Sequence, residues 1–215
     1  MISVIIPVRD EPAIREFLLR LHEVLGSIPE DYEVLVITSD KEKLHTPIPS
    51  LPHQKVFKSY GDSLERAILL GFSVSNGDKL VVLDSDGSHP PEIIPDLLEG
   101  LEQHDFAIAS RFLPQSKFNY PLFRKLVSLF FVKFAQLFGS NLSDPMSGFF
   151  AVKKSLVEKL RFKPVKWKTA LEIELKSRPN VYEVAFEFKK RKAGVSKAKM
   201  LTGLKILWDV FWVTI

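Results

Sequence analysis

Two aspartates one residue apart, Asp84 and Asp86, have the types and spacing that most directly suggest chemistry. They follow the apolar run 80–83, so both carboxylates are expected at the mouth of a buried strand. At an irregular strand end, such carboxylates can bind one hard divalent cation that also holds a diphosphate. A turn or helix cap ahead of Pro90 and Pro91 is the competing interpretation, because Pro suits a first helical turn. The spacing alone leaves both interpretations open.

The elements that position these aspartates are predicted from alternating patterns in the first 86 residues. Such alternation is typical of βαβ units and predicts an α/β fold with a mainly parallel sheet flanked by helices. Ligands of these sheets bind outside the carboxyl ends of the strands, so acidic residues that follow the strands are expected at one edge. The strand-like runs are 2–8, 34–38 and 80–83, and the helical ones are 14–25 and 64–74. The acidic residues are Asp10, Glu11, Asp40, Asp84 and Asp86.

Two later segments predict apolar helices. Residues 121–138 have apolar side chains at three- and four-residue steps and mostly basic polar positions. A basic amphipathic helix rich in Phe and Leu can lie in a membrane interface, although ordinary core packing explains the same pattern. Residues 201–215 predict another helix, which could dock on the domain, lie in an interface or lead into membrane spans. No run approaches the roughly 20 apolar residues that span a bilayer.

Composition limits the class of protein. The chain has 215 residues, 46% of them hydrophobic, which predicts one folded domain and argues against intrinsic disorder. It has no Cys, which excludes disulfides and thiolate zinc sites. Residues 1–100 hold nine basic and 17 acidic side chains, whereas residues 101–215 hold 21 basic and nine acidic ones. The resulting net charges, −8 and +12, suggest different partners for the two halves, and a basic half usually meets phosphate, nucleic acid or an anionic membrane.

Several motifs occur in a characteristic order. They are Ile5 to Glu11, Gly77 to Glu92, Ser110 to Phe112, Asp144 to Phe149, and Phe188 to Lys197. This ordered set resembles the glycosyltransferase family 2 enzymes, and within them the dolichyl-phosphate mannosyltransferase group, from residue 2 to about residue 200. The resemblance implies a single Rossmann-like GT-A catalytic domain over 1–215. In it, 1–110 would bind nucleotide sugar and metal, 111–200 would bind the acceptor, and 201–215 would form the C-terminal helix.

The resemblance also implies roles for individual residues. Those expected to bind the nucleotide sugar are Pro7, Arg9, Glu11, Asp84 and Asp86. Asp84 and Asp86 are expected to hold Mg²⁺ or Mn²⁺, with Ser88, water or a donor phosphate as the third ligand. Those expected to bind the acceptor phosphate are Arg111, Arg124, Ser128, Arg191 and Lys197. Asp84, Asp86, Arg111 and Arg191 are the expected catalytic residues. Ser147 and Gly148 match the acceptor-side loop. Asp144 is expected to orient the acceptor region or a phosphate-binding Arg, or to act as a structural cap.

Departures from the family pattern leave the donor base open. Arg9 and Asp10 replace an aromatic-Asn pair, and Thr38 and Ser39 stand where two aspartates commonly bind the base. Ser88 replaces a Gln near the metal, and Phe150 replaces a common Arg.

The expected activity is inverting transfer of mannose from GDP-mannose to dolichyl or polyprenyl phosphate. A phosphate monoester has a second pKa of about 6 and is mostly ionised at neutral pH, so no general base is obligatory. The protein is expected to be peripheral, on the cytoplasmic face of a membrane, with or without a membrane-spanning partner subunit. One alternative is transfer from a UDP-sugar such as UDP-glucose, and another is a silent membrane or nucleic-acid module. Nucleic acid is not an expected partner, because the Phe positions follow a helical stripe.

Overall fold

The computed structural model describes residues 1–41, 43–61, 63–118, 122–162 and 168–188. Its strands are β1 (Ile2–Val8), β2 (Tyr32–Ser39), β3 (Gln54–Ser59), β4 (Lys79–Val82), β5 (Phe106–Ser110), β6 (Lys117–Phe118), β7 (Phe150–Lys153), β8 (Val181–Ala185) and β9 (Glu187–Phe188). Its helices are α1 (Ile14–Gly26), α2 (Leu64–Val74), the 3₁₀ turn η1 (Pro91–Ile93), α3 (Ile94–Gln103), α4 (Leu122–Leu137), α5 (Lys154–Val157) and α6 (Thr169–Ser177).

Seven strands form one sheet in the order β3-β2-β1-β4-β7-β5-β8, and β6 pairs with β9 in a small second sheet. Within the large sheet, β7 runs antiparallel to both of its neighbours, and the other pairings are parallel. All seven residues of β1 are buried, as expected for a strand with both faces covered. Because β7 is reversed, its amino end lies at the edge where the parallel strands end.

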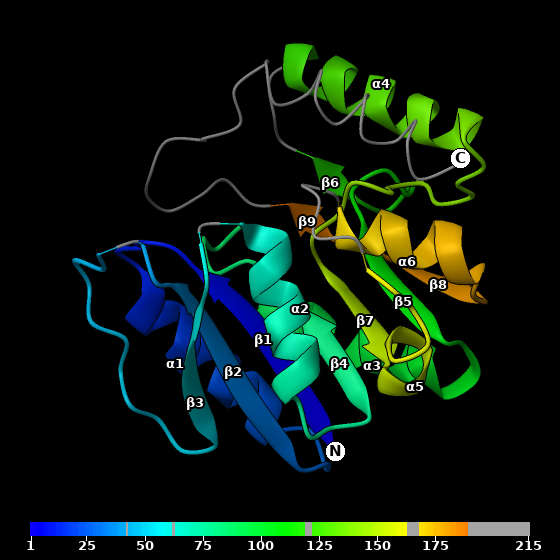
Figure 1. Cartoon of the computed structure of the whole chain (residues 1–215). Coiled ribbons are helices and arrows are strands. Elements are labelled where there is room, and N and C mark those ends of the chain that lie inside the picture. Colours follow the sequence, from blue (N-terminus) through cyan, green and yellow to red (C-terminus); the bar gives the residue numbers. More distant parts are fainter. Residues whose placement is uncertain (42, 62, 119–121, 163–167, 189–215) are drawn as a thin grey trace.

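Helices cover both faces of the sheet (Figure 1). On one face, alternate residues of β1 such as Val4 and Ile6 pack with apolar side chains of α1 and α3. On the other face, Ile5 packs with side chains of α2, α5 and α6. This alternation of side chains along the strand confirms the predicted α/β fold of a mainly parallel sheet between helices.

Helix α4 crosses the upper end of the molecule above α6 (Figure 1). Ala135 is fully buried against Leu171 of α6. Several apolar side chains of α4 are instead exposed, among them Leu126 at 57% and Phe130 at 56%. No helix in the described ranges is long and apolar enough to span a bilayer. The predicted amphipathic helix therefore exists, and it has apolar side chains both toward the domain and on its exposed side.

Candidate functional site

The first aspartate, Asp84, follows the end of β4 and is fixed through its backbone. Its N–H donates to Nδ1 of His89 over 2.9 Å. The His89 ring is 3% exposed and stacks on Phe149 with ring centroids 5.3 Å apart. Burial lowers the pKa of His89, and because Nδ1 accepts a hydrogen bond, the neutral ring carries its proton on Nε2. His89 thus holds the Asp84 backbone, while the Asp84 side chain remains 37% exposed.

The second aspartate, Asp86, is held by a tight turn. One carboxylate oxygen, Oδ1, accepts hydrogen bonds from the Ser88 backbone N–H at 2.9 Å and from the Ser88 hydroxyl at 2.5 Å. Gly87 makes the turn possible with a φ of +78°, which other residues rarely adopt. The turn that the competing interpretation expects is therefore present, and it fixes the Asp86 carboxylate beside the loop of Asp84.

The donor chemistry of this loop fits Mg²⁺ or Mn²⁺. Asp84 and Asp86 supply carboxylate oxygens, and Ser88 supplies a hydroxyl oxygen, all hard donors of the kind these ions prefer. Within the described ranges, no cluster of three or more His, Cys, Asp or Glu side chains is arranged to hold a metal. A cation here would therefore need oxygens from elsewhere, such as water or a bound diphosphate, in addition to the two aspartates.

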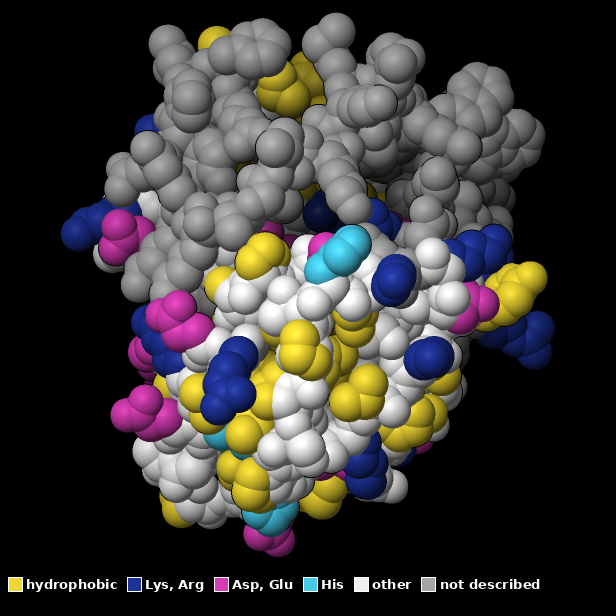
Figure 2. All heavy atoms as spheres, turned by 90° about the vertical axis from the view of Figure 1, so that its left-hand side faces the viewer, with side chains coloured by type: hydrophobic (Ala, Val, Ile, Leu, Met, Phe, Trp, Pro, Cys, Tyr) yellow, Lys and Arg dark blue, Asp and Glu magenta, His cyan; other side chains and the backbone are white. Residues whose placement is uncertain are grey.

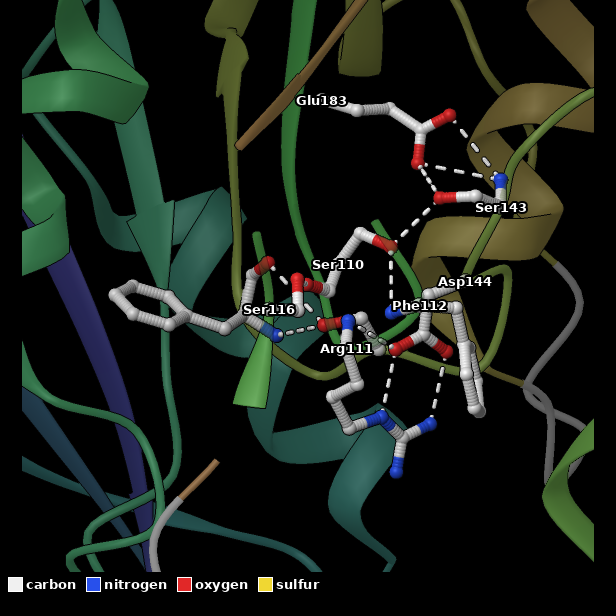
Figure 3. Close-up of polar contacts among 9 residues, drawn as sticks. Ser110, Arg111, Phe112, Ser116, Ser143, Asp144 and Glu183 are labelled. Carbon is white, nitrogen blue, oxygen red and sulfur yellow. Dashed lines mark hydrogen bonds and ion pairs between the residues drawn. The ribbon is translucent and has the colours of Figure 1, made fainter. Parts of the chain in front are cut away.

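Arg111, immediately after β5, forms a bidentate ion pair with Asp144. The Arg111 Nε atom lies 2.6 Å from Oδ2 of Asp144, and Nη2 lies 2.8 Å from Oδ1. The Arg111 backbone N–H also donates to Oδ2, over 3.1 Å (Figure 3). The Asp144 side chain is fully buried, and that of Arg111 is 15% exposed. Asp144 therefore binds both the side chain and the backbone of Arg111, and whether that arginine binds phosphate stays a prediction.

The Asp84 loop and the Arg111 ion pair lie together at the same edge of the sheet. A Cβ atom placed on Gly148 would lie 3.4 Å from Oδ2 of Asp84, so the loop that begins at Asp144 reaches the first aspartate. The ring of Phe188 joins the two groups from another side. Its centroid lies 5.8 Å from that of His89 and 5.3 Å from the Arg111 guanidinium carbon. Carboxylates and a fixed guanidinium thus flank one region.

The expected nucleotide residues lie at the ends of β1 and α1. Pro7 is buried within β1, paired with Ile37, whereas Arg9 is exposed. Glu11 accepts a hydrogen bond from the Ala13 N–H over 3.3 Å. Pro7, Arg9 and Glu11 are therefore close together in the chain, and the pairing of β1 with β4 brings them to the edge where Asp84 and Asp86 lie.

Hydrogen bonds from the end of β2 and from the loop that follows it hold the backbone beside these residues in place. The His45 backbone N–H and ring Nδ1 lie 2.8 and 2.6 Å from the two carboxylate oxygens of Asp10. Thr38 and Ser39 donate their hydroxyl protons to the carbonyls of Phe57 and Gly61. Figure 2 shows this side of the molecule, where apolar side chains gather over the centre and charges of both signs surround them.

The remaining acceptor residues are less well defined. Ser128 lies on α4 and is half-buried. Arg124 is also on α4, but its side chain is outside the described part. Arg191, Lys197 and the predicted helix 201–215 lie outside the described residues. Their expected roles stay predictions.

Sequence reasoning missed three residues that the structure brings to the site. His45 binds Asp10 from 35 positions away, and Ser143 and Glu183 form hydrogen bonds beside Arg111. None of the three lies in a pattern that indicates a site, apart from the place of Ser143 directly before Asp144. Only the three-dimensional structure reveals these contacts, because they join residues far apart in the chain.

Comparison with known proteins places these features in context. The family model described as glycosyl transferase family 2 matches residues 3–161. A dolichol-phosphate mannosyltransferase from Pyrococcus furiosus is 34% identical over 98% of this chain and 62% of its own. An undecaprenyl-phosphate mannosyltransferase from Micrococcus luteus is 31% identical over 63% of this chain and 60% of its own. The chain thus spans about three fifths of the length of each of these two relatives.

Solved structures agree on the fold. A glucosyl-3-phosphoglycerate synthase from Mycobacterium tuberculosis, crystallised with Mn²⁺, UDP-glucose and phosphoglyceric acid, superposes with a TM-score of 0.64. The alignment covers 98% of this chain and 77% of that one, at 17% identity. At this identity the likeness concerns the fold, which is of the GT-A type.

Proposed function

Because the chain belongs to glycosyl transferase family 2, we propose that it transfers mannose from GDP-mannose to the phosphate of dolichol or another polyprenol, inverting the anomeric centre. The observation that carries the proposal is the meeting of two groups at one sheet edge. Gly148 and Phe188 link the Asp84 loop, suited to a metal and a diphosphate, to the Arg111–Asp144 pair, suited to a phosphate.

The proposed chemistry needs little from the protein beyond binding and charge. An oxygen of the ionised lipid phosphate attacks the anomeric carbon of mannose, and the bond from that carbon to the diphosphate breaks, with the electron pair leaving on GDP. A divalent cation held by Asp84 and Asp86 would stabilise the negative charge that develops on the leaving diphosphate. Attack opposite the leaving group inverts the configuration, and no proton has to move.

Arg111 is the residue proposed to hold the acceptor phosphate. A guanidinium is a planar array of N–H donors whose geometry matches phosphate oxygens, and its Nε and Nη2 atoms are held by Asp144. Asp144 fixes the direction of the fork before any ligand arrives, which lowers the entropy cost of binding a phosphate.

Helix α4 supports the proposal that the protein acts as a peripheral protein at a membrane surface, which we place on the cytoplasmic face. Its exposed apolar side chains, such as Leu126 and Phe130, accompany an exposed Lys133. A helix of this kind can place apolar groups among lipid chains and its cation among anionic headgroups. Arg124, Ser128, Arg191 and Lys197 are proposed to assist Arg111, and a membrane-spanning partner subunit is compatible with this arrangement.

The test is a transfer assay with purified protein, GDP-mannose, Mg²⁺ or Mn²⁺ and dolichyl phosphate in detergent. We expect lipid-linked mannose as the product. Asp86→Asn should reduce the rate on the order of a hundredfold or more, because it removes a charge that neutralises the cation. The matched control is Asp96→Asn, on an exposed position of α3, which should transfer at the wild-type rate. Full activity of Asp86→Asn would refute the metal site.

Transfer from a UDP-sugar is the second candidate, and the last two residues of β2 favour keeping it. Where the family commonly places two aspartates for the base, Thr38 and Ser39 donate their hydroxyl protons to backbone carbonyls. Thr38 and Ser39 themselves supply no carboxylate to receive the N–H groups of guanine. Calorimetric titration with GDP and with UDP, each with Mn²⁺, distinguishes the two donors, and tighter binding of UDP would replace GDP-mannose in the proposal.

A further inference from the structure

The turn that carries Arg111 is connected to a carboxylate on a different strand. Ser110, the last residue of β5, lies 2.6 Å from Ser143, measured between the two hydroxyl oxygens. The Ser143 hydroxyl in turn donates to Oε2 of Glu183, on β8, and the Ser143 backbone N–H lies 3.1 and 3.2 Å from the two Glu183 oxygens (Figure 3).

The donors and acceptors of these hydrogen bonds can be assigned in one consistent way. Each serine hydroxyl has a single proton, and an ionised carboxylate can only accept. Ser143 therefore gives its proton to Glu183, so Ser110 must give its own proton to Ser143. The Ser110 oxygen is then left to accept, and it receives the Phe112 backbone N–H over 3.2 Å. A series of hydrogen bonds thus connects the backbone N–H of Phe112, the residue after Arg111, to the Glu183 carboxylate.

These hydrogen bonds form a second connection beside the ion pair of Arg111 and Asp144. Ser110 precedes Arg111, and Ser143 precedes Asp144, so two adjacent cross-links join the end of β5 to the same loop. Glu183 gives that loop a rigid anchor, because its strand pairs with β5 at Ile108. A bond to a charged acceptor is stronger than a neutral one, so the carboxylate adds to the rigidity.

From this geometry we propose that Glu183, acting through Ser143 and Ser110, is a positioning residue that fixes Arg111 for the acceptor phosphate. The proposal rests on the function proposed above. We expect only the binding of the acceptor to change when this series of hydrogen bonds is broken, because neither the Ser110–Ser143 bond nor the Ser143–Glu183 bond involves Asp84 or Asp86.

The experiment measures steady-state kinetics of Ser143→Ala with GDP-mannose and dolichyl phosphate. We expect KM for dolichyl phosphate to rise on the order of tenfold, with KM for GDP-mannose nearly unchanged, because a misdirected guanidinium binds phosphate poorly. Ser110→Ala should show the same split, and Ser143→Thr should restore the wild-type value because it keeps the hydroxyl and the N–H. Hydrogen exchange should be faster at the Phe112 amide in both alanine variants.

The matched control is Ser75→Ala, at a buried serine whose hydroxyl donates to the Phe72 carbonyl near the end of α2. It should leave both KM values unchanged. If the unmutated protein transfers mannose but Ser143→Ala has an unchanged KM for dolichyl phosphate, or raises both KM values equally, the positioning role is refuted and the proposed function stands. If the unmutated protein transfers no mannose, the proposed function falls, and the positioning role falls with it.

Discussion

Arg111 and Asp144 form an ion pair in which one partner is wholly buried. Asp144 has no exposed side-chain surface, and its carboxylate receives three N–H groups of Arg111. A buried pair of this kind contributes little relative to an apolar pair, but losing one partner leaves the other charge uncompensated. The energy of the pair is therefore visible mainly when it is broken.

Asp144→Ala should destabilise the protein by about 3–5 kcal/mol, because the Arg111 charge would remain at an 85%-buried position without its carboxylate. Urea unfolding followed by circular dichroism measures the loss. The control is Asp105→Ala, which breaks the pair with Lys153, where the two side chains are 50% and 37% exposed. An exposed pair contributes about 0–1 kcal/mol, so equal losses in the two variants would contradict the buried-pair explanation.

At the residue scale, sequence predicted chemical types better than partners. Asp84, Asp86 and Arg111 were predicted to be functional from motifs and from a strand end, and the structure brings them to one edge of the sheet. The sequence did not show which residue Asp144 binds, because a partner 33 positions away, Arg111, leaves no local pattern. Glu183 was not predicted at all, since a carboxylate in a strand looks like an ordinary exposed residue until its register with β5 is known.

The loop between β2 and β3 is held to the end of β1 by one carboxylate. Asp10 accepts from the backbone N–H of His45 and contacts its ring, and these bonds lower the pKa of Asp10, the backbone bond most. A carboxyl group with a lowered pKa stabilises the fold above its ordinary pKa. That contribution is lost as the pH falls through the lowered value.

His45→Ala should raise the pKa of Asp10 part of the way to its ordinary value, because the ring is removed and the backbone N–H remains. The carbon resonance of the Asp10 carboxyl group, followed by NMR through an acid titration, measures the shift. Lys43→Ala, at an exposed position of the same loop, is the control, since Lys43 is not among the groups that lower this pKa. An unchanged pKa in His45→Ala, or a fully ordinary one, would show that the bonds are assigned wrongly.

Helix α4 gives the membrane proposal a direct test. The double change Leu126→Glu and Phe130→Glu should weaken binding to anionic phospholipid vesicles by about tenfold or more, because burying each such side chain contributes about 1.5–3 kcal/mol. Co-sedimentation with vesicles measures the bound fraction. Leu19→Glu, at a 48%-exposed leucine of α1, should bind as the wild type does. A similar loss in that control would point to general charge repulsion by the vesicle.

At the element scale, strong periodicity was predictive and long-range pairing was not. The runs at 2–8 and 64–74 match β1 and α2, and the stripe at 121–138 matches α4 within one residue. The sequence did not predict β3, in which lysines interrupt the apolar pattern of an edge strand. It also did not predict β7, whose four residues become an antiparallel strand through pairing with β4 and β5.

The acidic and basic parts of the sequence do not form separate units in the structure. The net charge changes sign between residues 1–100 and 101–215, and the expected functional boundary follows residue 110. Strand β7 comes from beyond both boundaries, yet it lies between β4 and β5, which precede residue 111. The Asp84 loop and the Arg111–Asp144 pair accordingly share one sheet edge, where Gly148 approaches Asp84. If the chain is one domain, as predicted, neither part should fold without the other, since neither contains a complete sheet.

A fragment of residues 1–110 should not fold by itself. Without β7, the backbone N–H and C=O groups on the facing sides of β4 and β5 have no partner strand, and side chains such as Val82 and Ile108 lose the buried Phe150. In urea titrations followed by circular dichroism, the whole chain should unfold in one sigmoidal transition, whereas the fragment should give a gradual change without a midpoint. Adding a 111–215 fragment should restore a transition if the two associate through β7. A cooperative transition of 1–110 alone, with a midpoint like that of the whole chain, would mean that residues 1–110 are an independent domain and that β7 only covers its edge.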